Sequence, residues 1–301
     1  PSYGYGIQLY SDSSFELKGG TIESTQETVD VYTITDNVDI KISGGKLISS
    51  KDAVMNLRGK STTATVTKGE LESHGGIAGV FVSGGSSVES VVFTVSGGSL
   101  YSTSGPAILT DYAVTVNIGG KAAIESTGTG ISTKGSSELN VTGGTISGQS
   151  YGIQTRYSSH ANISGGEISG NKAVYAGDTS TVKVSGGVLD GKSSAIATES
   201  GSGMTVEVTG GDFGDQDISQ YLPNSKIADP EVEITASGNV LTANASHPLA
   251  EAVFTYQWHK NGVKLDNGTS ATLTADEYTT YSVEVTADYN GIQSTTVVVY
   301  E

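Results

Sequence analysis

Aromatic and charged side chains recur at one place in the chain, within or directly after short segments that begin with glycine or alanine followed by isoleucine or valine. The residues that share this place are Asp111, Tyr112, Lys134, Gln154, Arg156, Tyr157, Tyr175, Asp178 and Glu199. Tyrosine rings offer apolar faces to sugar rings, and charged or amide groups form hydrogen bonds with hydroxyls. The combination predicts a ligand-binding surface. The alternative interpretation is a solvated corner whose mixed charges discourage aggregation.

Residue sets that could catalyse a reaction or hold a metal are absent from the sequence. No group of aspartates has the spacing of a calcium site. The four histidines, His74, His160, His247 and His259, are scattered and include no His-x-x-x-His pair that would suit zinc. Cysteine is also absent, which excludes disulfides and thiolate ligands. We therefore predict no catalytic residues, no metal and no cofactor, and we favour a non-enzymatic protein.

The charge balance limits the classes of partner. The chain has 16 lysines and arginines against 32 aspartates and glutamates, a formal net charge of -16. A nucleic-acid-binding protein would normally show a basic stripe, and none is present. Anionic membranes are disfavoured for the same electrostatic reason. No apolar run approaches the ~20 residues of a membrane span, so we expect no membrane insertion within this chain.

A Gly-Gly pair that follows an apolar-polar pair repeats along the chain at a spacing of about 24 residues. The copies are Gly19-Gly20, Gly44-Gly45, Gly97-Gly98, Gly119-Gly120, Gly143-Gly144, Gly165-Gly166, Gly186-Gly187 and Gly210-Gly211. Each repeat contains three strand-length segments in which apolar and polar residues alternate, which places one face inside and one outside. No window shows a helical period. An internal repeat of this length predicts a solenoid.

Three short strands per coil, stacked coil on coil, make a parallel β-helix of about nine coils over residues 1–225. The stacking predicts interior columns, in which equivalent apolar residues of successive coils lie above one another. They are Ile118, Val141, Ile163, Val184 and Val208; Ile131, Ile153, Val174 and Ile196; and Ile146, Ile168 and Leu189. The glycine pairs should supply corners with positive φ or allow close backbone approach. A column of small residues, serine in the early coils and glycine from Gly148 on, should mark another bend.

This repeat resembles the right-handed, pectate-lyase-like β-helix superfamily, and most closely the glycine-rich surface proteins of Gram-positive bacteria. The superfamily includes polysaccharide lyases and glycoside hydrolases, so the resemblance implies polysaccharide cleavage as the alternative function. The sequence departs from the motifs of the polygalacturonase-like enzymes. It has no Asp-Asp and no Asn-Thr-Asp, and its Arg58-Gly59-Lys60 precedes the half-matching Ser73-His74-Gly75 in the wrong order.

The pattern changes after residues 220–230, which contain two of the five prolines and read as a linker. Longer alternating segments follow, with hairpin signals at Asn261-Gly262 and Asn290-Gly291. Residues 226–301 resemble an immunoglobulin-like β-sandwich, with Trp258 as its core tryptophan and Tyr281 in its tyrosine corner. The all-β chain is thus expected to combine a right-handed parallel β-helix with a small immunoglobulin-like domain.

These observations lead to one functional expectation and two alternatives. We expect a monomeric bacterial protein, secreted or associated with the cell wall, whose β-helix presents a face for adhesion to a glycan or a host surface. The first alternative is a polysaccharide lyase or glycoside hydrolase, which would need converging carboxylates or a basic residue in a groove. The second is a purely structural stalk, which needs neither these groups nor exposed aromatic rings.

Overall fold

The protein divides into two compact units, Pro1–Val206 and Glu207–Glu301. The structure, a computed structural model, describes residues 4–32, 36–84, 91–201, 203–222, 226–276 and 279–301. Residues 223–225 of the predicted linker lie outside this part. The boundary at residue 225, which rests on the change of sequence pattern, remains a prediction, since residues 207–222 belong to the second compact unit. No helix among the described residues is long and apolar enough to cross a membrane.

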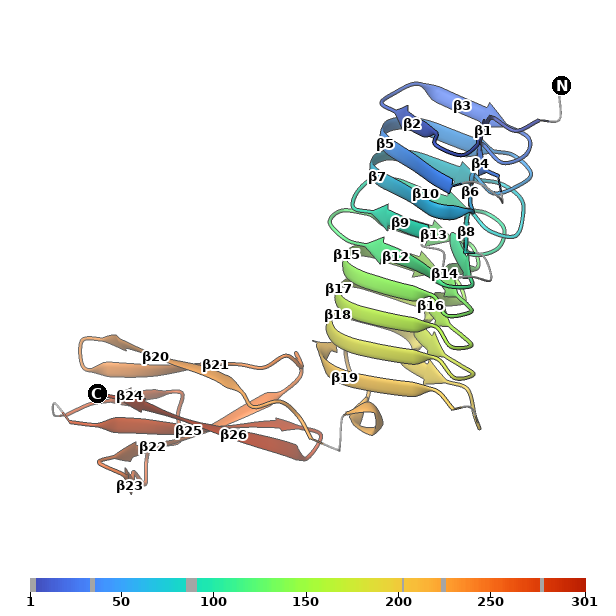
Figure 1. Ribbon diagram of the computed structural model, residues 1–301. Coiled ribbons are helices and arrows are strands. Elements are labelled where there is room, and N and C mark those ends of the chain that lie inside the picture. The colour runs from blue at the N-terminus through green and yellow to red at the C-terminus, as the bar shows by residue number, and fades with distance from the viewer. Residues whose placement is uncertain (1–3, 33–35, 85–90, 202, 223–225, 277–278) are drawn as a thin grey trace. The chain divides into compact units, whose positions relative to one another are not determined.

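The first unit is a parallel β-solenoid of about eight turns in its described part, where the sequence suggested about nine. The estimate of nine included the last glycine pair, which already belongs to the second unit. Figure 1 shows the strands stacked coil on coil, each turn contributing a first, a second and a third strand. Long strands bend through corners and supply the second and third strands of one turn, and two of them continue into the first strand of the next turn.

The first-strand column consists of β1 (Ile7–Leu9), β4 (Val29–Val31), β6 (Met55–Leu57), β8 (Val80–Ser83), β11 (Ile108–Asp111), β14 (Thr129–Thr133), β16 (Tyr151–Thr155) and the ends of β17 (His160–Ala176) and β18 (Thr181–Thr198). The second and third columns consist of β2 (Ser14–Leu17), β3 (Thr21–Ser24), β5 (Asp36–Ser49), β7 (Lys60–Ser73), β9 (Val91–Val95), β10 (Ser99–Ser102), β12 (Val114–Ile118), β13 (Ala123–Ser126), β15 (Glu138–Gly148) and the starts of β17 and β18. β19 (Thr205–Asp212) crosses the division between the units.

The predicted interior columns are confirmed within the first unit. Parallel pairing aligns Ile131 with Ile153, Ile153 with Val174, and Val174 with Ile196, and each of these side chains is buried. The other two columns are aligned in the same way. Burying one such side chain contributes ~1.5–3 kcal/mol, and no single turn can bury its own apolar face. Stability therefore comes from contacts between neighbouring turns, and the alternating polar residues form columns outside.

Two columns of small residues form the corners, as predicted. In the Gly-Gly corner, Gly166 has φ +89°, and a Cβ atom on Gly165 would lie 2.6 Å from the backbone oxygen of Thr142 in the preceding turn. At the other bend, the serines of the column from Ser49 to Ser126 are buried and hydrogen-bonded to main-chain carbonyls, as Ser126 Oγ is to Gly105 O at 2.7 Å. From Gly148 onward, glycine replaces serine because the backbone is too close to admit a side chain.

The second unit contains two small antiparallel sheets. One sheet consists of β20 (Glu231–Ser237), β21 (Val240–Ser246) and β24 (Thr272–Thr274), and the other of β22 (Val253–Lys260), β23 (Val263–Lys264), β25 (Tyr281–Tyr289) and β26 (Ile292–Tyr300). A short 3-10 helix, η1 (Ser219–Tyr221), precedes them. The Asn261-Gly262 and Asn290-Gly291 turns both have positive φ at both residues, as the hairpin prediction requires.

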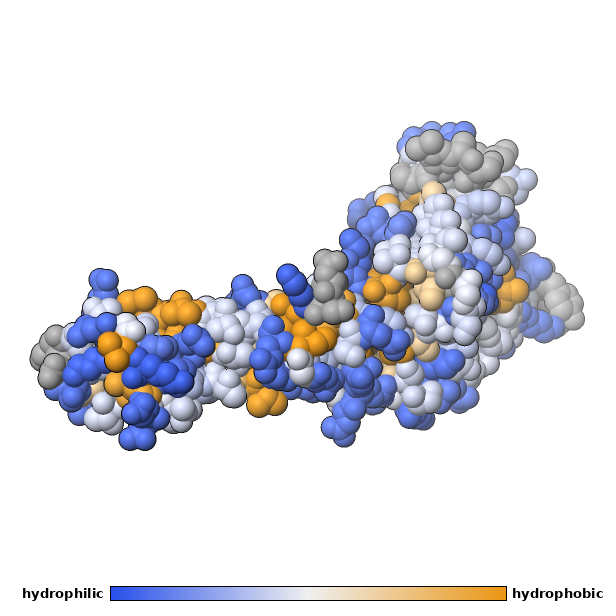
Figure 2. Space-filling view, turned by 90° about the horizontal axis from the view of Figure 1, so that it is seen from below, coloured by the Kyte–Doolittle hydropathy of each residue, from blue (hydrophilic) through white to orange (hydrophobic). Residues whose placement is uncertain are grey.

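The core of the second unit joins side chains from both sheets. Trp258 is fully buried and packs with Leu241, Val283 and Tyr281. Its Nε1 donates to Ser270 O at 2.9 Å, so the polar end of the indole is satisfied. On the face drawn in Figure 2, apolar residues of this unit form separate patches between hydrophilic ones. Trp258 therefore serves as a core residue.

Candidate functional site

The first cluster of functional side chains lies where β16 pairs with the end of β17. Pairing aligns Tyr151 with Lys172 and Gln154 with Tyr175, and the alternation with buried Ile153 and Val174 directs Gln154 and Tyr175 outward. Tyr151 and Lys172 stand at the start of these paired segments and are partly exposed. The rings of Tyr151 and Tyr175 have centroids 5.1 Å apart at an interplanar angle of 46°. Lys172 Nζ lies 5.8 Å from the Tyr151 centroid and 5.4 Å from that of Tyr175. The lysine is thus held over two aromatic faces.

Arg156 forms the centre of the corner that follows this strand. Its Nε donates to Asp178 Oδ2 at 3.0 Å and its Nη2 donates to Glu199 Oε1 at 3.1 Å. The arginine thereby bridges two successive turns. Gly177 occupies the aligned position between Arg156 and Glu199, and a Cβ atom there would lie 3.1 Å from Glu199 Oε2 and 3.2 Å from the Tyr175 ring. Glycine therefore leaves the space through which the guanidinium reaches both carboxylates.

Hydrogen bonds, nearby charges and burial shift the pKa values of three groups at this corner. The backbone N–H of Tyr157 and then the Arg156 side chain lower the pKa of the Asp178 carboxyl. The hydrogen bond to Asp178 raises the pKa of Arg156. Partial burial, followed by the charge of Glu199, raises the pKa of the Tyr175 hydroxyl. The lowered pKa keeps the Asp178 carboxylate charged at neutral pH, where its oxygens can accept hydrogen bonds.

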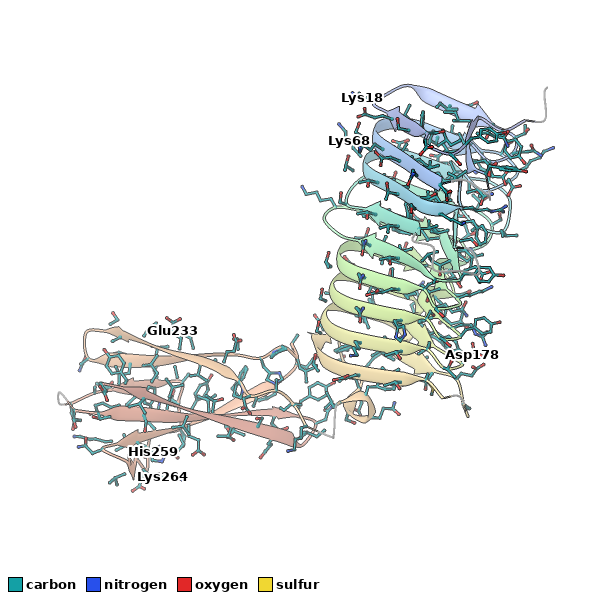
Figure 3. The ribbon with its side chains drawn as sticks, in the orientation of Figure 1. Lys18, Lys68, Asp178, Glu233, His259 and Lys264 are labelled. Atoms are coloured by element: carbon teal, nitrogen blue, oxygen red, sulfur yellow. The ribbon has the colours of Figure 1, made fainter. Side chains whose placement is uncertain are left out.

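The residue that follows Arg156 has a left-handed backbone, and so do its equivalents in other turns. Tyr112 has φ 60°, Tyr157 φ 55° and Asp178 φ 55°, while Gly135 takes the same place one turn after Tyr112. Such values are uncommon for residues with a side chain. They turn the chain at the corner and leave the rings of Tyr112 and Tyr157 exposed at 50% and 55%. In Figure 3, Asp178 lies on the opposite side of the coils from Lys18 and Lys68.

The structure brings together six of the nine residues singled out from the sequence. Gln154, Arg156, Tyr157, Tyr175, Asp178 and Glu199 form one group through the contacts above. Asp111, Tyr112 and Lys134 lie farther along the same corner, in the two preceding turns. There Asp111 accepts a hydrogen bond from the backbone N–H of Tyr112 at 3.0 Å, and the backbone N–H of Lys134 donates to Thr110 Oγ1.

The equivalent positions in the first turns could not be recognised from the sequence pattern. Pairing aligns Gln8 with Asp30 and Asp30 with Asn56 in the first-strand column, so Tyr10, Tyr32 and Arg58 follow at its corner. The rings of Tyr10 and Tyr32 have centroids 5.7 Å apart, and both side chains are about half exposed. These early turns have degenerate repeats, which hid the register. Lys172 was also missed, although its alignment with Tyr151 follows from the interior columns.

Seven of the eight tyrosines described in the first unit lie on this one side of the coils, and both arginines of the chain lie there as well. We call this side the tyrosine face, formed by Tyr5, Tyr10, Tyr32, Tyr112, Tyr151, Tyr157 and Tyr175 with Arg58 and Arg156. The eighth tyrosine, Tyr101, lies in the third-strand column in β10. A solvated corner of mixed charges would not require this concentration of aromatic rings.

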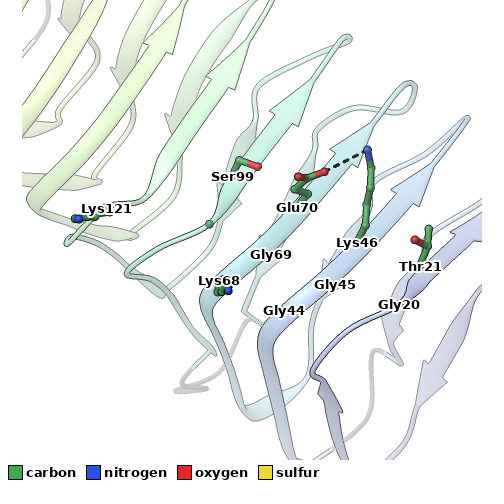
Figure 4. Close-up of a pocket in the computed structure, with 11 residues that line it drawn as sticks. Gly20, Thr21, Gly44, Gly45, Lys46, Lys68, Gly69, Glu70, Ser99 and Lys121 are labelled. Carbon is green, nitrogen blue, oxygen red and sulfur yellow. Dashed lines mark ion pairs between the residues drawn. The ribbon is translucent and has the colours of Figure 1, made fainter.

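Another surface hollow lies elsewhere, along the Gly-Gly corner. It measures about 680 Å³ and is lined by glycines of successive turns together with Lys46, Lys68 and Lys121. Figure 4 shows the lysines at its edge and the ion pair of Lys46 with Glu70. Lys46 also pairs with Glu72 at 2.7 Å, so part of the positive charge is neutralised. No aromatic ring lines this hollow among the residues described, and it exists because the glycines lack side chains.

Comparison with known proteins supports the fold and leaves the ligand open. No curated protein and no solved structure gives a significant match to the chain. A family model described as "Right handed beta helix region" matches residues 78–217. Together with the parallel register of the coils, this match shows that the solenoid of the first unit is a right-handed β-helix.

Proposed function

We propose that the protein is a non-enzymatic bacterial surface protein that binds carbohydrate along the tyrosine face of its β-helix. The observation that carries the proposal is the collection of seven tyrosines and both arginines on one face. Aromatic rings next to fixed charged groups match the two surfaces of a sugar, its apolar ring face and its hydroxyl edge. The Arg156 corner supplies carboxylate oxygens that accept from hydroxyls, and Lys172 supplies a donor between two rings.

The rigidity of the face supports binding without a large entropic cost. The backbone under the rings is a ladder of paired strands, and Arg156 is already held by two carboxylates before any ligand arrives. Pre-organised groups lose less conformational freedom when they bind. An extended polysaccharide would contact several turns at once, because the tyrosines are distributed from the first turns to the last.

The second unit is proposed to be an immunoglobulin-like domain that acts as a spacer or second contact module. Its two sheets and buried tryptophan are typical of that class. The Tyr281 hydroxyl donates to Asp276 Oδ1 at 2.7 Å and accepts from the Asp276 backbone N–H at 3.4 Å, an arrangement similar to a tyrosine corner. Secretion or attachment to the cell wall and a monomeric state belong to the same proposal.

A glycan array tests the proposed function, with Tyr157→Ala and Arg156→Ala against Tyr101→Ala as the matched control. We expect the unmodified protein to bind a subset of glycans and Tyr157→Ala to weaken that binding roughly tenfold, about 1.4 kcal/mol. Tyr101→Ala removes a tyrosine from another face and should leave binding unchanged. Absence of binding by the unmodified protein, or equal binding by all variants, would refute the assignment of this face.

Polysaccharide cleavage remains the alternative function. An enzyme of this kind would release reducing ends or unsaturated products from polygalacturonate or a related polymer. If cleavage activity persists through repeated purification and is lost in a variant of the tyrosine face, this face is a catalytic site rather than a binding surface. A protein that neither binds nor cleaves a glycan would instead be a structural stalk.

A further inference from the structure

A small cavity opens at the tyrosine face in the first turns of the β-helix. It measures about 270 Å³ and is lined by Tyr5, Gln8, Glu27, Asp30, Val31, Tyr32, Asn56 and Arg58. Its size, below that of pockets for drug-sized ligands, suits one ring or one short side chain. The polar side chains come from three successive turns, because pairing aligns Gln8, Asp30 and Asn56 in the first-strand column.

Two carboxylates converge in this cavity. The Asn56 amide donates through Nδ2 to Glu27 Oε1 at 3.2 Å and to Asp30 Oδ1 at 3.1 Å, while Gln8 Nε2 donates to Asp30 Oδ2 at 3.1 Å. Asp30 is only 6% exposed and Asn56 only 3%. Neither carboxylate forms an ion pair within 4 Å with any cation of the described residues. Buried carboxylates in proteins are normally paired with a positive charge.

The surroundings of these carboxylates have negative potential. Burial raises the pKa of the Glu27 carboxyl, and the nearby charges of Asp52 and Asp30 add to this effect. The charge of Glu27 and then that of Asp30 raise the pKa of the Tyr5 hydroxyl, which Arg58 opposes. Arg58 instead places its guanidinium 5.6 Å from the centroid of the Phe81 ring. The cavity is therefore lined by two carboxylates, Glu27 and Asp30, and by only one positively charged side chain, Arg58.

A second observation also indicates a missing donor. Asn56 Oδ1 is buried and accepts no hydrogen bond from the residues that the structure describes. A buried acceptor without a partner costs ~1–3 kcal/mol. Tyr5 and Tyr32 flank the same cavity and are each 45% exposed, so a cation that enters would meet aromatic faces as well as carboxylates. A metal ion is the poorer match, because no group of three acidic or histidine side chains gathers among the described residues.

We propose that this cavity binds the free ammonium group of an amino sugar, held by Glu27 and Asp30 and flanked by Tyr5 and Tyr32. The inference rests on the proposed carbohydrate-binding function and names the sugar class that the N-terminal end of the tyrosine face selects. A primary ammonium has three donors, which match two carboxylates and a further acceptor. An N-acetylated sugar lacks the charge and carries extra bulk, so the cavity discriminates against it.

Calorimetric titration of the full chain with a trimer of β-1,4-linked glucosamine tests this inference, with the fully N-acetylated trimer as the matched ligand. We expect the free-amine trimer to bind at least tenfold more tightly than the acetylated one. Glu27→Gln and the isosteric Asp30→Asn should each reduce that affinity at least tenfold. Glu125→Gln, which removes an exposed carboxylate from β13 in the third-strand column, should leave the affinity unchanged.

The melting temperature of each variant checks that it is folded, and Glu27→Gln, at a less buried residue, keeps the test valid if Asp30→Asn fails to fold. Equal affinity for both trimers, or an affinity that Glu27→Gln does not change, would overturn the ammonium site and leave carbohydrate binding at the Arg156 end intact. Displacement of the amine by millimolar calcium would assign the cavity to a metal instead. Failure of the glycan array as well would remove both proposals.

Discussion

At the scale of single residues, the ion pairs of the Arg156 corner depend on Gly177, which has no side chain. Gly177 stands between Arg156 and Glu199 in the column, and any side chain there would crowd the ion pairs and the Tyr175 ring. The repeat register predicted the charged members of the corner. The register does not predict which charges pair, because pairing depends on side-chain length and on the empty space above the glycine.

The same scale explains what the sequence could not provide for the N-terminal cavity. Gln8, Asp30 and Asn56 are separated by 22 and 26 residues, and only the structural register aligns them. The first turns lack the regular marker spacing from which the register of later turns was predicted. A buried aspartate in an irregular repeat cannot be distinguished from a turn residue by sequence pattern alone.

Asp276 provides a prediction about acid sensitivity in the second unit. Hydrogen bonds from Lys260 and then Tyr281 lower the pKa of Asp276 to about 2, below its value in the unfolded chain. Stability from this carboxylate is therefore present above pH ~4 and is lost as the pH falls toward 2. We expect Asp276→Asn to lower the melting temperature at pH 7, and the difference from the unmodified protein to shrink between pH 4 and pH 2.

Trp258 fluorescence is the measurement for this comparison, because Trp258 is the only tryptophan and lies in the core of the second unit. Asp266→Asn, at an exposed aspartate of the same unit, is the control and should melt like the unmodified protein. A melting difference for Asp276→Asn that persists unchanged at pH 2 would contradict the assignment.

At the scale of elements, the corners of the β-helix were predicted well because their composition is specific. Glycine pairs indicated positions with positive φ or close backbone approach, and the structure contains both. The serine column was predicted only as a bend. Its hydroxyls hydrogen-bond to carbonyls of the chain, a role that residue size alone does not reveal. The short strand β23 was not predicted, since two residues give no alternation to recognise.

Gly186→Ala tests the packing of the Gly-Gly corner. A Cβ atom at this position would lie 2.6 Å from Ser164 O in the preceding turn, so the backbone must shift. We expect a loss of about 1–3 kcal/mol in the free energy of unfolding, the usual cost of overpacking. Urea unfolding followed by far-ultraviolet circular dichroism measures it.

Gly19→Ala is the matched control for this corner, because a Cβ atom there meets nothing within 4 Å. Its stability should be unchanged or slightly higher, since alanine restricts the unfolded chain. Equal destabilisation by both substitutions would mean that backbone conformation, rather than contact between turns, determines the choice of glycine.

At the scale of the whole molecule, the two units have separate cores built on different principles. The first unit is stabilised by contacts between similar, stacked turns, and the second by two sheets packed around Trp258. The repeat period predicted the β-solenoid of the first unit, whereas the immunoglobulin-like class of the second unit remains a prediction beside its two antiparallel sheets. The boundary at residue 225 remains a prediction from the change of sequence pattern, and the compact units of the structure meet between Val206 and Glu207.

Separate cores predict separate unfolding transitions. Thermal unfolding followed by Trp258 fluorescence reports the second unit, while far-ultraviolet circular dichroism is dominated by the strands of the first. We expect the two midpoints to differ and a calorimetric trace to resolve two peaks. Coincident transitions with a single peak would mean that the units unfold as one cooperative body.

The parallel register of the turns has a consequence for how such a molecule can change in length. Tyr151 and Lys172 occupy equivalent positions in successive layers, as do Lys172 and Ser194. Removing or duplicating one whole layer in the gene would therefore rejoin the chain at matching points and move the rest by a single strand spacing, ~4.8 Å. The distance between the proposed amine cavity and the Arg156 corner can thus change by one strand spacing for each turn gained or lost, while the residues of both sites stay the same.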